Sequence, residues 1–355
     1  MNNIRNLTYD ELKEYIISIG EKPFRANQIF DWIHKEMVSS YESMTNISND
    51  LKDKLKENYS IYMPTIYNKY ESKIDDTKKY LLLLEDQNII ECVLMKYKFG
   101  LTICISSQVG CNMSCKFCAS SIGGSKRNLQ IGELLSQIYV IQKDIKQKIS
   151  NIVIMGSGEP LMNYENIVKF LYIINDERGQ NISFRNITIS TCGIVPKIKD
   201  LSKLELPITL ALSLHSPNQE VRQKIMPIAN KYDYDETLNA IKEYYLKNKR
   251  RITIEYSLMK NINDSEDQAH ELSRHLRQYF FNKNINDKNV DFNVNLIPVN
   301  EVKEFNIKRP SDKTIYKFKN ILENNNINVT IRRELGSDIS SSCGMLRRRH
   351  IGTSF

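Results

Sequence analysis

Three closely spaced cysteines are the residues of this sequence with the clearest chemical potential. Cys111, Cys115 and Cys118 lie in the run CISSQVGCNMSCKFCAS, directly after an apolar stretch typical of a strand, and no fourth ligand follows at similar spacing. Three thiolates can hold three irons of a 4Fe-4S cluster and leave the fourth iron open to chelate a substrate and pass it one electron. Electron-carrier clusters use four thiolates, and structural zinc sites also close four positions. The spacing therefore predicts a cluster with one open iron.

Two other interpretations of these thiols stay open. They could bind zinc together with a distant Cys or His, or they could be buried thiols without a metal. Against both, the spacing C-x3-C-x2-C with Phe117 in the second interval resembles that of the radical S-adenosylmethionine (SAM) enzymes. The resemblance implies reductive cleavage of SAM to a 5′-deoxyadenosyl radical, but it does not name a substrate.

Length and composition are ordinary for a protein that folds in water. The chain has 355 residues, of which 41% are hydrophobic and 26% charged, enough for one large domain with a smaller companion. No apolar run reaches the length of a membrane span, and the N-terminus lacks an apolar signal core. Seven cysteines without a regular framework disfavour a secreted disulfide scaffold. We expect a cytoplasmic protein, a monomer, with no membrane partner.

The distribution of charge favours a polyanionic partner. Residues 1–65 hold 8 Lys or Arg against 10 Asp or Glu, so about +10 belongs to the remainder of a chain whose net charge is +8. Lys126, Arg127 and the basic run 347–350 lie near cysteine motifs. RNA phosphates fit this pattern, although a solvated lysine-rich surface also accounts for the charge.

The elements that position these residues fall into three predicted parts. Residues 1–65 read as a small helical accessory domain, with a capping box from Thr8 to Glu11 at the first helix and a second helix from Phe24 to about Met37. Residues 66–100 read as a β extension or linker. Residues 101–355 alternate strands and helices, which predicts an α/β fold with a parallel sheet. Six or so units are too few for a closed eightfold barrel, so we expect a partial (β/α)6 barrel.

Polar motifs recur at the predicted carboxyl ends of the barrel strands, where active residues of such barrels gather. Gly156 and Gly158 allow close backbone approach, and Glu159 can accept hydrogen bonds from the ammonium group of SAM. Groups suited to ribose and adenine follow later strands: Ser190, Ser213, Leu214, His215 and Asn300. Taken singly, these residues also fit turns and helix caps.

Two further cysteines could form a catalytic pair or be inert. Cys104 precedes the three-cysteine loop by seven residues, and Cys343 lies in the Gly- and Ser-rich segment GSDISSSCGML. The residues alone do not decide between these two interpretations.

Several motifs together resemble the RlmN/Cfr family of radical SAM RNA methyltransferases, and specifically its RlmN branch. They are Glu91, ICISSQVGCNMSCKFC, MGSGEPL, SLHSPN and RRELGSDISSSCG, with EKPFRANQIFDWIH resembling the accessory domain. The resemblance covers nearly the whole chain. It implies methylation of carbon 2 of one adenosine in the peptidyl-transferase region of 23S rRNA, and in many members of an adenosine next to the tRNA anticodon.

The resemblance also implies roles by position. Cys111, Cys115 and Cys118 match the ligands of the 4Fe-4S cluster. Cys343 matches the cysteine that becomes S-methylated, Cys104 the resolving cysteine, and Glu91 the proton acceptor. SAM contacts are implied for Gly158, Glu159, Ser190, Ser213, Leu214, His215 and Asn300.

The reactivity of adenine is consistent with these roles. Carbon 2 of adenine is electron-poor and cannot attack the electrophilic methyl group of SAM, so a different route is required. One SAM would methylate the Cys343 thiolate, and a second SAM would yield the radical that takes hydrogen from that S-methyl group. The resulting carbon radical would add to adenine and crosslink enzyme to RNA. Cys104 would then attack the sulfur of Cys343 while Glu91 removes the ring proton. Each turnover needs two SAM molecules, a low-potential electron donor and a reductant for the disulfide.

A few positions depart from the family pattern. The C-terminal motif usually reads ACGQL, whereas Ser342 and Met345 replace its first and fourth residues here, and Ser157 stands where Met is common. Cys192 we interpret as structural. Pro160 fits the RlmN branch, whereas Cfr-type enzymes, which methylate carbon 8 and confer antibiotic resistance, more often have Ala. A rival from another class is a noncatalytic RNA-binding protein with structural zinc.

Overall fold

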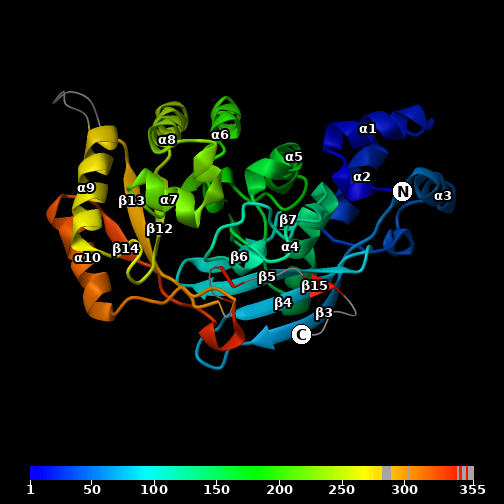
Figure 1. Ribbon diagram of the computed structural model, residues 1–355. Coiled ribbons are helices and arrows are strands. Elements are labelled where there is room, and N and C mark those ends of the chain that lie inside the picture. The colour runs from blue at the N-terminus through cyan, green and yellow to red at the C-terminus, as the bar shows by residue number, and fades with distance from the viewer. Residues whose placement is uncertain (282–288, 303, 342–343, 346–348, 351–355) are drawn as a thin grey trace.

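The structure is a computed structural model that describes residues 1–281, 289–302, 304–341, 344–345 and 349–350 (Figure 1). Within these residues, no helix is both long enough and apolar enough to cross a membrane.

The chain begins with three short helices. They are α1 (Tyr9–Ser18), α2 (Phe24–His34) and α3 (Asn49–Asn58). The capping box predicted at Thr8 is present, since its Oγ accepts from the Glu11 N–H and its own N–H donates to the Glu11 carboxylate. Helix α2 ends before Met37, the end expected from sequence, because Met37 adopts a left-handed φ of 54°. Two short parallel strands, β1 (Asn2–Asn3) and β2 (Tyr59–Ser60), bring the two ends of this segment together.

The helical segment is joined to the rest of the molecule by buried polar contacts with helix α4 (Ile131–Ile145). The His34 Nδ1 lies 2.9 Å from the Tyr139 hydroxyl, and the Gly132 N–H donates to the Asn6 side chain over 2.7 Å. Within the segment itself, the guanidinium of Arg5, which is fully buried, donates to the Ile61 carbonyl at 2.9 Å. The contacts of His34 and Gly132 hold the helices against the outside of the barrel (Figure 1).

An antiparallel part of the sheet comes next. It consists of β3 (Thr65–Glu71), β4 (Lys78–Leu83), β5 (Asn88–Tyr97) and β6 (Gly100–Ile105). The last described strand, β15 (Arg349–His350), pairs antiparallel with β5, so the C-terminal segment returns to this part of the sheet. Figure 1 shows that return in red beside β3 to β5.

Strand β6 also begins a parallel sheet that continues with six more strands. These are β9 (Asn151–Ile154), β10 (Ile187–Thr191), β11 (Thr209–Ser213), β12 (Ile252–Leu258), β13 (Phe292–Pro298) and β14 (Val329–Ile331). Connecting helices are α4, α5 (Tyr164–Asn175), α6 (Val195–Ser202), α7 (Gln219–Ile225), α8 (Tyr234–Asn248), α9 (Glu266–Phe280) and α10 (Asp312–Asn324). Among the described strands, the order runs from β14 to β3 without joining these two ends. The predicted partial (β/α)6 barrel with its β extension is confirmed.

The core explains why these residues form strands. Successive residues Asn88 to Met95 of β5 are all buried, as expected of a strand covered on both faces. The helices bury one face each against the sheet and leave the carboxyl ends of the parallel strands facing a common edge. All the loops singled out from sequence meet at that edge.

Candidate active site

A cavity of about 150 Å³ lies at the carboxyl ends of the parallel strands. It collects most of the residues that the sequence predicted for the cluster and for SAM. They are Cys111, Cys115, Cys118, Gly158, Glu159, Ser190, Ser213, His215 and Asn300. Leu214 does not line the cavity, because its side chain is fully buried and its N–H donates to the Glu255 carbonyl at 3.0 Å.

The three-cysteine loop is fixed by backbone hydrogen bonds from distant parts of the chain. The Lys116 N–H donates to the Ile225 carbonyl at 3.0 Å, and the Ala119 N–H donates to the Gly344 carbonyl at 2.7 Å. Burial raises the pKa of Cys111 to about 12, and burial likewise raises the pKa of Cys115. Thiols in such surroundings become thiolates only beside positive charge, which iron supplies.

The donor set fits a cluster better than a single ion. No three His, Cys, Asp or Glu side chains in the described part of the chain are grouped to hold one metal ion. Each thiolate of a 4Fe-4S cluster binds a different iron, so the ligands surround a cavity instead of converging on a point. Three thiols on one cavity meet that requirement.

Glu159 is held rigidly at the cavity wall. Its Oε2 accepts from the Cys192 N–H at 2.8 Å, its Oε1 accepts from the Leu161 N–H at 3.1 Å, and its own N–H donates to Gln108 at 2.9 Å. Burial raises its pKa, and the hydrogen bonds oppose that shift. Cys192 thus supports this carboxylate through both its backbone N–H and its side chain. A carboxylate fixed in this way is suited to accept from an ammonium group.

Gly158 allows the close approach of backbone that this wall requires. Its φ is +107°, and a Cβ atom there would lie 2.6 Å from the Ser107 Oγ and 2.7 Å from the Gln108 side chain. We expect Gly158→Ala to lower the free energy of unfolding by about 2–4 kcal/mol, from backbone strain and steric overlap together. Urea denaturation of the two proteins measures this difference.

Gly20→Ala is the matched control, because Gly20 also has a positive φ, +81°, but nothing lies within 4 Å of the added Cβ. It should cost only about 1 kcal/mol, from the backbone conformation alone. Equal losses in the two variants would contradict the steric account.

His215 presents one ring nitrogen to the cavity. Its φ is +60°, its Nδ1 accepts from the Ser257 N–H at 2.9 Å, and its ring meets the Phe117 ring edge-to-face with centroids 4.8 Å apart. Burial lowers its pKa to about 3, so the ring is neutral at physiological pH. Because Nδ1 accepts, the proton resides on Nε2, which can donate to a ligand.

Sequence reasoning missed a buried ionic group in the same cavity. Glu255 on β12 lines it, accepts from the Asn295 amide at 2.8 Å and lies 3.9 Å from the Arg332 guanidinium. Met155 also lines the cavity, and its sulfur is 3.6 Å from Arg332. A lone Glu within the apolar strand ITIEYSL was the available signal.

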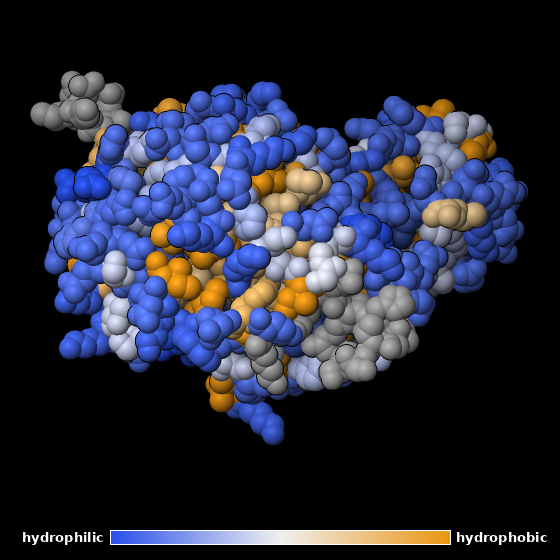
Figure 2. Space-filling view, viewed as in Figure 1, coloured by the Kyte–Doolittle hydropathy of each residue, from blue (hydrophilic) through white to orange (hydrophobic). Residues whose placement is uncertain are grey.

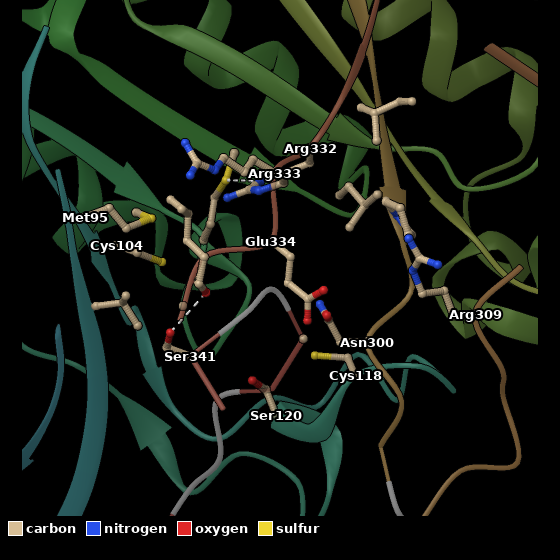
Figure 3. A pocket seen from close by; sticks show the side chains of 18 of the residues that line it. Met95, Cys104, Cys118, Ser120, Asn300, Arg309, Arg332, Arg333, Glu334 and Ser341 are labelled. Atoms are coloured by element: carbon tan, nitrogen blue, oxygen red, sulfur yellow. Dashed lines mark hydrogen bonds between the residues drawn. The ribbon is translucent and has the colours of Figure 1, made fainter. Parts of the chain in front are cut away.

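A second cavity, of about 170 Å³, adjoins the first and contains Cys104 (Figure 3). Cys104 projects from β6 on one side, whereas Cys118 and Asn300 lie on the other. The two cavities share seven lining residues: Cys118, Met155, Gly156, Ile297, Asn300, Arg332 and Gly344. The resolving thiol predicted from sequence therefore faces a space continuous with the wall of the cluster cavity.

The other two predicted catalytic residues are Glu91, which the structure describes, and Cys343, which it does not. Glu91 lies on β5 two residues before Val93, and Val93 is the cross-strand partner of Cys104. The side chain of Glu91 is therefore on the same face of the sheet as that of Cys104. It is fully buried and lines neither cavity. Cys343 lies outside the described residues. Ser341 and Gly344, on either side of it in sequence, both line the second cavity.

The basic residues near the cysteine motif are not all available to RNA. Arg127 donates to both oxygens of Glu133 and to Asp86, each at 2.8 Å, and these carboxylates raise its pKa. It therefore serves as an internal ion-pair partner, contrary to the expectation of a phosphate contact. Of the basic run at 347–350, residues 347 and 348 lie outside the described residues, and 349–350 form β15.

Comparisons with known proteins agree with this geometry. Residues 2–61 match the ribosomal RNA large subunit methyltransferase N-terminal domain, and residues 105–272 match the radical SAM superfamily. A protein of Clostridium novyi (strain NT), named probable dual-specificity RNA methyltransferase RlmN, is 52% identical, with 99% of each chain covered. One of the same name from Clostridioides difficile (strain 630) is 51% identical, with 98% of each chain covered.

A solved structure also matches this chain over nearly its full length. The crystal structure of a radical SAM methyltransferase from Sphaerobacter thermophilus superposes with a TM-score of 0.90 at 35% identity, covering 98% of this chain and 99% of the other. Identity at this level over the full length shows common family membership. This chain belongs to the RlmN family of radical SAM RNA methyltransferases.

Proposed function

We propose that this enzyme methylates carbon 2 of an adenosine in the peptidyl-transferase region of 23S rRNA and of an adenosine next to the anticodon in tRNA. The observation that carries the proposal is the adjacency of the two cavities, one lined by the three-cysteine loop and the other by Cys104. A methyl transfer through two protein thiols needs the radical source and those thiols within one connected space. The printed name of the relatives, with its words "dual-specificity", supports two RNA substrates.

Cofactor binding is assigned to the first cavity. Cys111, Cys115 and Cys118 would hold the 4Fe-4S cluster, and Glu159 would accept from the amino group of SAM. Ser190, Ser213, His215 and Asn300 would contact ribose and adenine, and Gly158 would contribute backbone. Leu214 is assigned to the SAM site by its position in the motif, since its own N–H and carbonyl are hydrogen-bonded within the protein. When bound, the cluster and SAM supply a 5′-deoxyadenosyl radical, and two SAM molecules are used per turnover.

The thiols complete the transfer. Cys343 accepts the methyl group as a thioether, and the derived carbon centre joins to carbon 2 of the base. The adduct radical would give up one electron, and Glu91 would take the proton from carbon 2. Cys104 would then attack the sulfur of Cys343, so that an S–S bond forms as the S–C bond breaks, and the released methylene would take up a proton to become the methyl group. Since Glu91 is fully buried, its assignment requires a path for the carbon 2 proton from the cavity.

The remaining assignments concern the whole protein. We place it in the cytoplasm as a monomer, served by a low-potential electron donor and a disulfide reductant. Residues 1–65 would form an RNA-binding accessory domain, 66–100 a β extension, and 101–355 the catalytic barrel. The matches at residues 2–61 and 105–272 support this division.

Identification of the product tests the proposal. The reconstituted enzyme, given SAM, reductant and a 23S rRNA fragment or unmodified tRNA, should yield 2-methyladenosine when the RNA is digested and analysed by mass spectrometry. Synthetic 2-methyladenosine and 8-methyladenosine serve as standards. The appearance of 8-methyladenosine would favour the Cfr-type alternative and overturn the assignment of carbon 2.

A further inference from the structure

We propose that the hairpin between β5 and β6 is a stacking platform for a base of the RNA substrate, at the mouth of the Cys104 cavity. Tyr97 ends β5 and pairs with Gly100, so Lys98 and Phe99 form a two-residue turn. The rings of Tyr97 and Phe99 lie parallel within 5°, with centroids 5.0 Å apart. Two aromatic rings are thus already aligned before any ligand binds.

One face of the Phe99 ring is exposed to solvent and is available for stacking. Phe99 is 71% exposed, although Tyr97 covers one side of its ring. The stack with Tyr97 stabilises the turn, but it leaves most of the Phe99 side chain in water. Every nucleobase has a π-face that can stack on such a ring, whatever its identity.

The platform is continuous with the second cavity. Tyr97 lines that cavity together with Val93 and Met95, because alternate residues of β5 face the same side. Val93 is the cross-strand partner of Cys104, and Tyr97 lies four residues further, about 13 Å along the strand. A nucleotide near the one that reacts beside Cys104 can reach this distance. Figure 2 shows apolar side chains near the centre of the side of the molecule that it presents, surrounded by hydrophilic surface.

Charge complements the rings. Lys98 lies in the turn beside Phe99 and is exposed. It makes no hydrogen bond or ion pair with any described residue. Lys96 is also exposed, but it lies on the other face of β5 from Tyr97 and pairs with Asp76 at 3.3 Å. Aromatic rings interleaved with lysines are typical of surfaces that bind single-stranded nucleic acid.

Stacking here would compensate a cost of the reaction. The target adenosine must leave its stack for its ring carbon to enter the cavity, which costs stacking energy. A neighbouring base that stacks on Phe99 recovers part of that energy without reading its identity. The inference rests on the proposed function to the extent that an RNA strand enters the Cys104 cavity, and it explains tolerance of two RNAs.

Binding measurements on Phe99 variants test the platform. We expect Phe99→Ala in the reconstituted enzyme to weaken binding of a 23S rRNA fragment and of unmodified tRNA about 5- to 100-fold. Phe99→Trp should bind like the parent, whereas Phe99→Leu should not restore affinity. Cleavage of SAM without RNA should be unchanged in all three. Tyr316→Ala, which removes a ring that is 58% exposed on α10, should leave affinity unchanged.

Two results would overturn the platform: affinity of Phe99→Ala within twofold of the parent, or full restoration by Phe99→Leu, which would show apolar contact without stacking. Neither result bears on the product of the reaction. Conversely, finding 8-methyladenosine would defeat the proposed function and leave the binding test intact, because stacking does not depend on which ring carbon is methylated.

Discussion

Replacing Cys104 with alanine is expected to stop the enzyme while it is covalently joined to its RNA. Under the proposed mechanism, generation of the radical and its addition to adenine would not use this thiol, but release would, because the S–C bond would break only as the S–S bond forms. Removing a nucleophile of this kind should lower multiple-turnover methylation by at least about 1,000-fold. A labelled RNA should migrate with the protein on a denaturing gel, in an amount that approaches one RNA per enzyme.

Two control variants show whether the crosslink results from loss of the Cys104 thiol in particular. Cys92→Ala removes a fully buried thiol from the opposite face of the neighbouring strand β5, and it should leave turnover near that of the parent. Cys343→Ala should form no crosslink and no product, yet still cleave SAM. Release of free methylated RNA by Cys104→Ala would contradict the role assigned to Cys104.

Cys115→Ala is expected to abolish the cluster and with it all SAM cleavage. Two remaining thiols cannot hold three irons, and Cys115 lines the first cavity between the other two ligands in sequence. After anaerobic reconstitution we expect iron and sulfide contents well below half of the parent's, loss of the brown absorbance, and no detectable 5′-deoxyadenosine. Iron analysis and chromatography of the nucleoside measure these quantities.

Cys192→Ala is the matched control for this experiment. Cys192 lines the same cavity and is buried, and burial raises its pKa as it does that of Cys115. Cys192 contacts Glu159 through its backbone N–H, which alanine retains, and through its thiol, which alanine removes, so the variant separates loss of a thiol contact from loss of a ligand. Loss of iron from Cys192→Ala together with retention in Cys115→Ala would show that the ligand set is wrong.

Much of the fold followed from local patterns. The capping box at Thr8, the alternation of strands with amphipathic helices, and the polar motifs at strand ends each involve residues near in sequence, and the structure contains all of them. Helix α2 ended earlier than expected because hydrophobic periodicity does not report the left-handed conformation at Met37. Backbone reversals of that kind depend on the contacts of the following segment.

The charge distribution predicted RNA contacts less well than local patterns predicted the fold. Arg127 looked available to phosphate in the sequence, but Glu133 at the start of α4 and Asp86 in the β4–β5 turn both bind it. Neither partner is adjacent to Arg127 in sequence. The sum of charges therefore said less about RNA contacts than the position of each charge within the fold.

The sequence by itself determined the candidate cluster ligands and the barrel, because an eight-residue span in one loop and a repeating β/α pattern are local properties of the chain. Only the tertiary structure decided that Cys104 faces a cavity sharing Cys118 and Gly344 with the cluster site. It likewise decided that Glu255 meets Arg332, and that Tyr97 and Phe99 stack beside that cavity. The first two pairings depend on strand register and on the return of the C-terminal segment, which places Gly344 beside Ala119, more than two hundred positions earlier, whereas the third depends on the hairpin conformation.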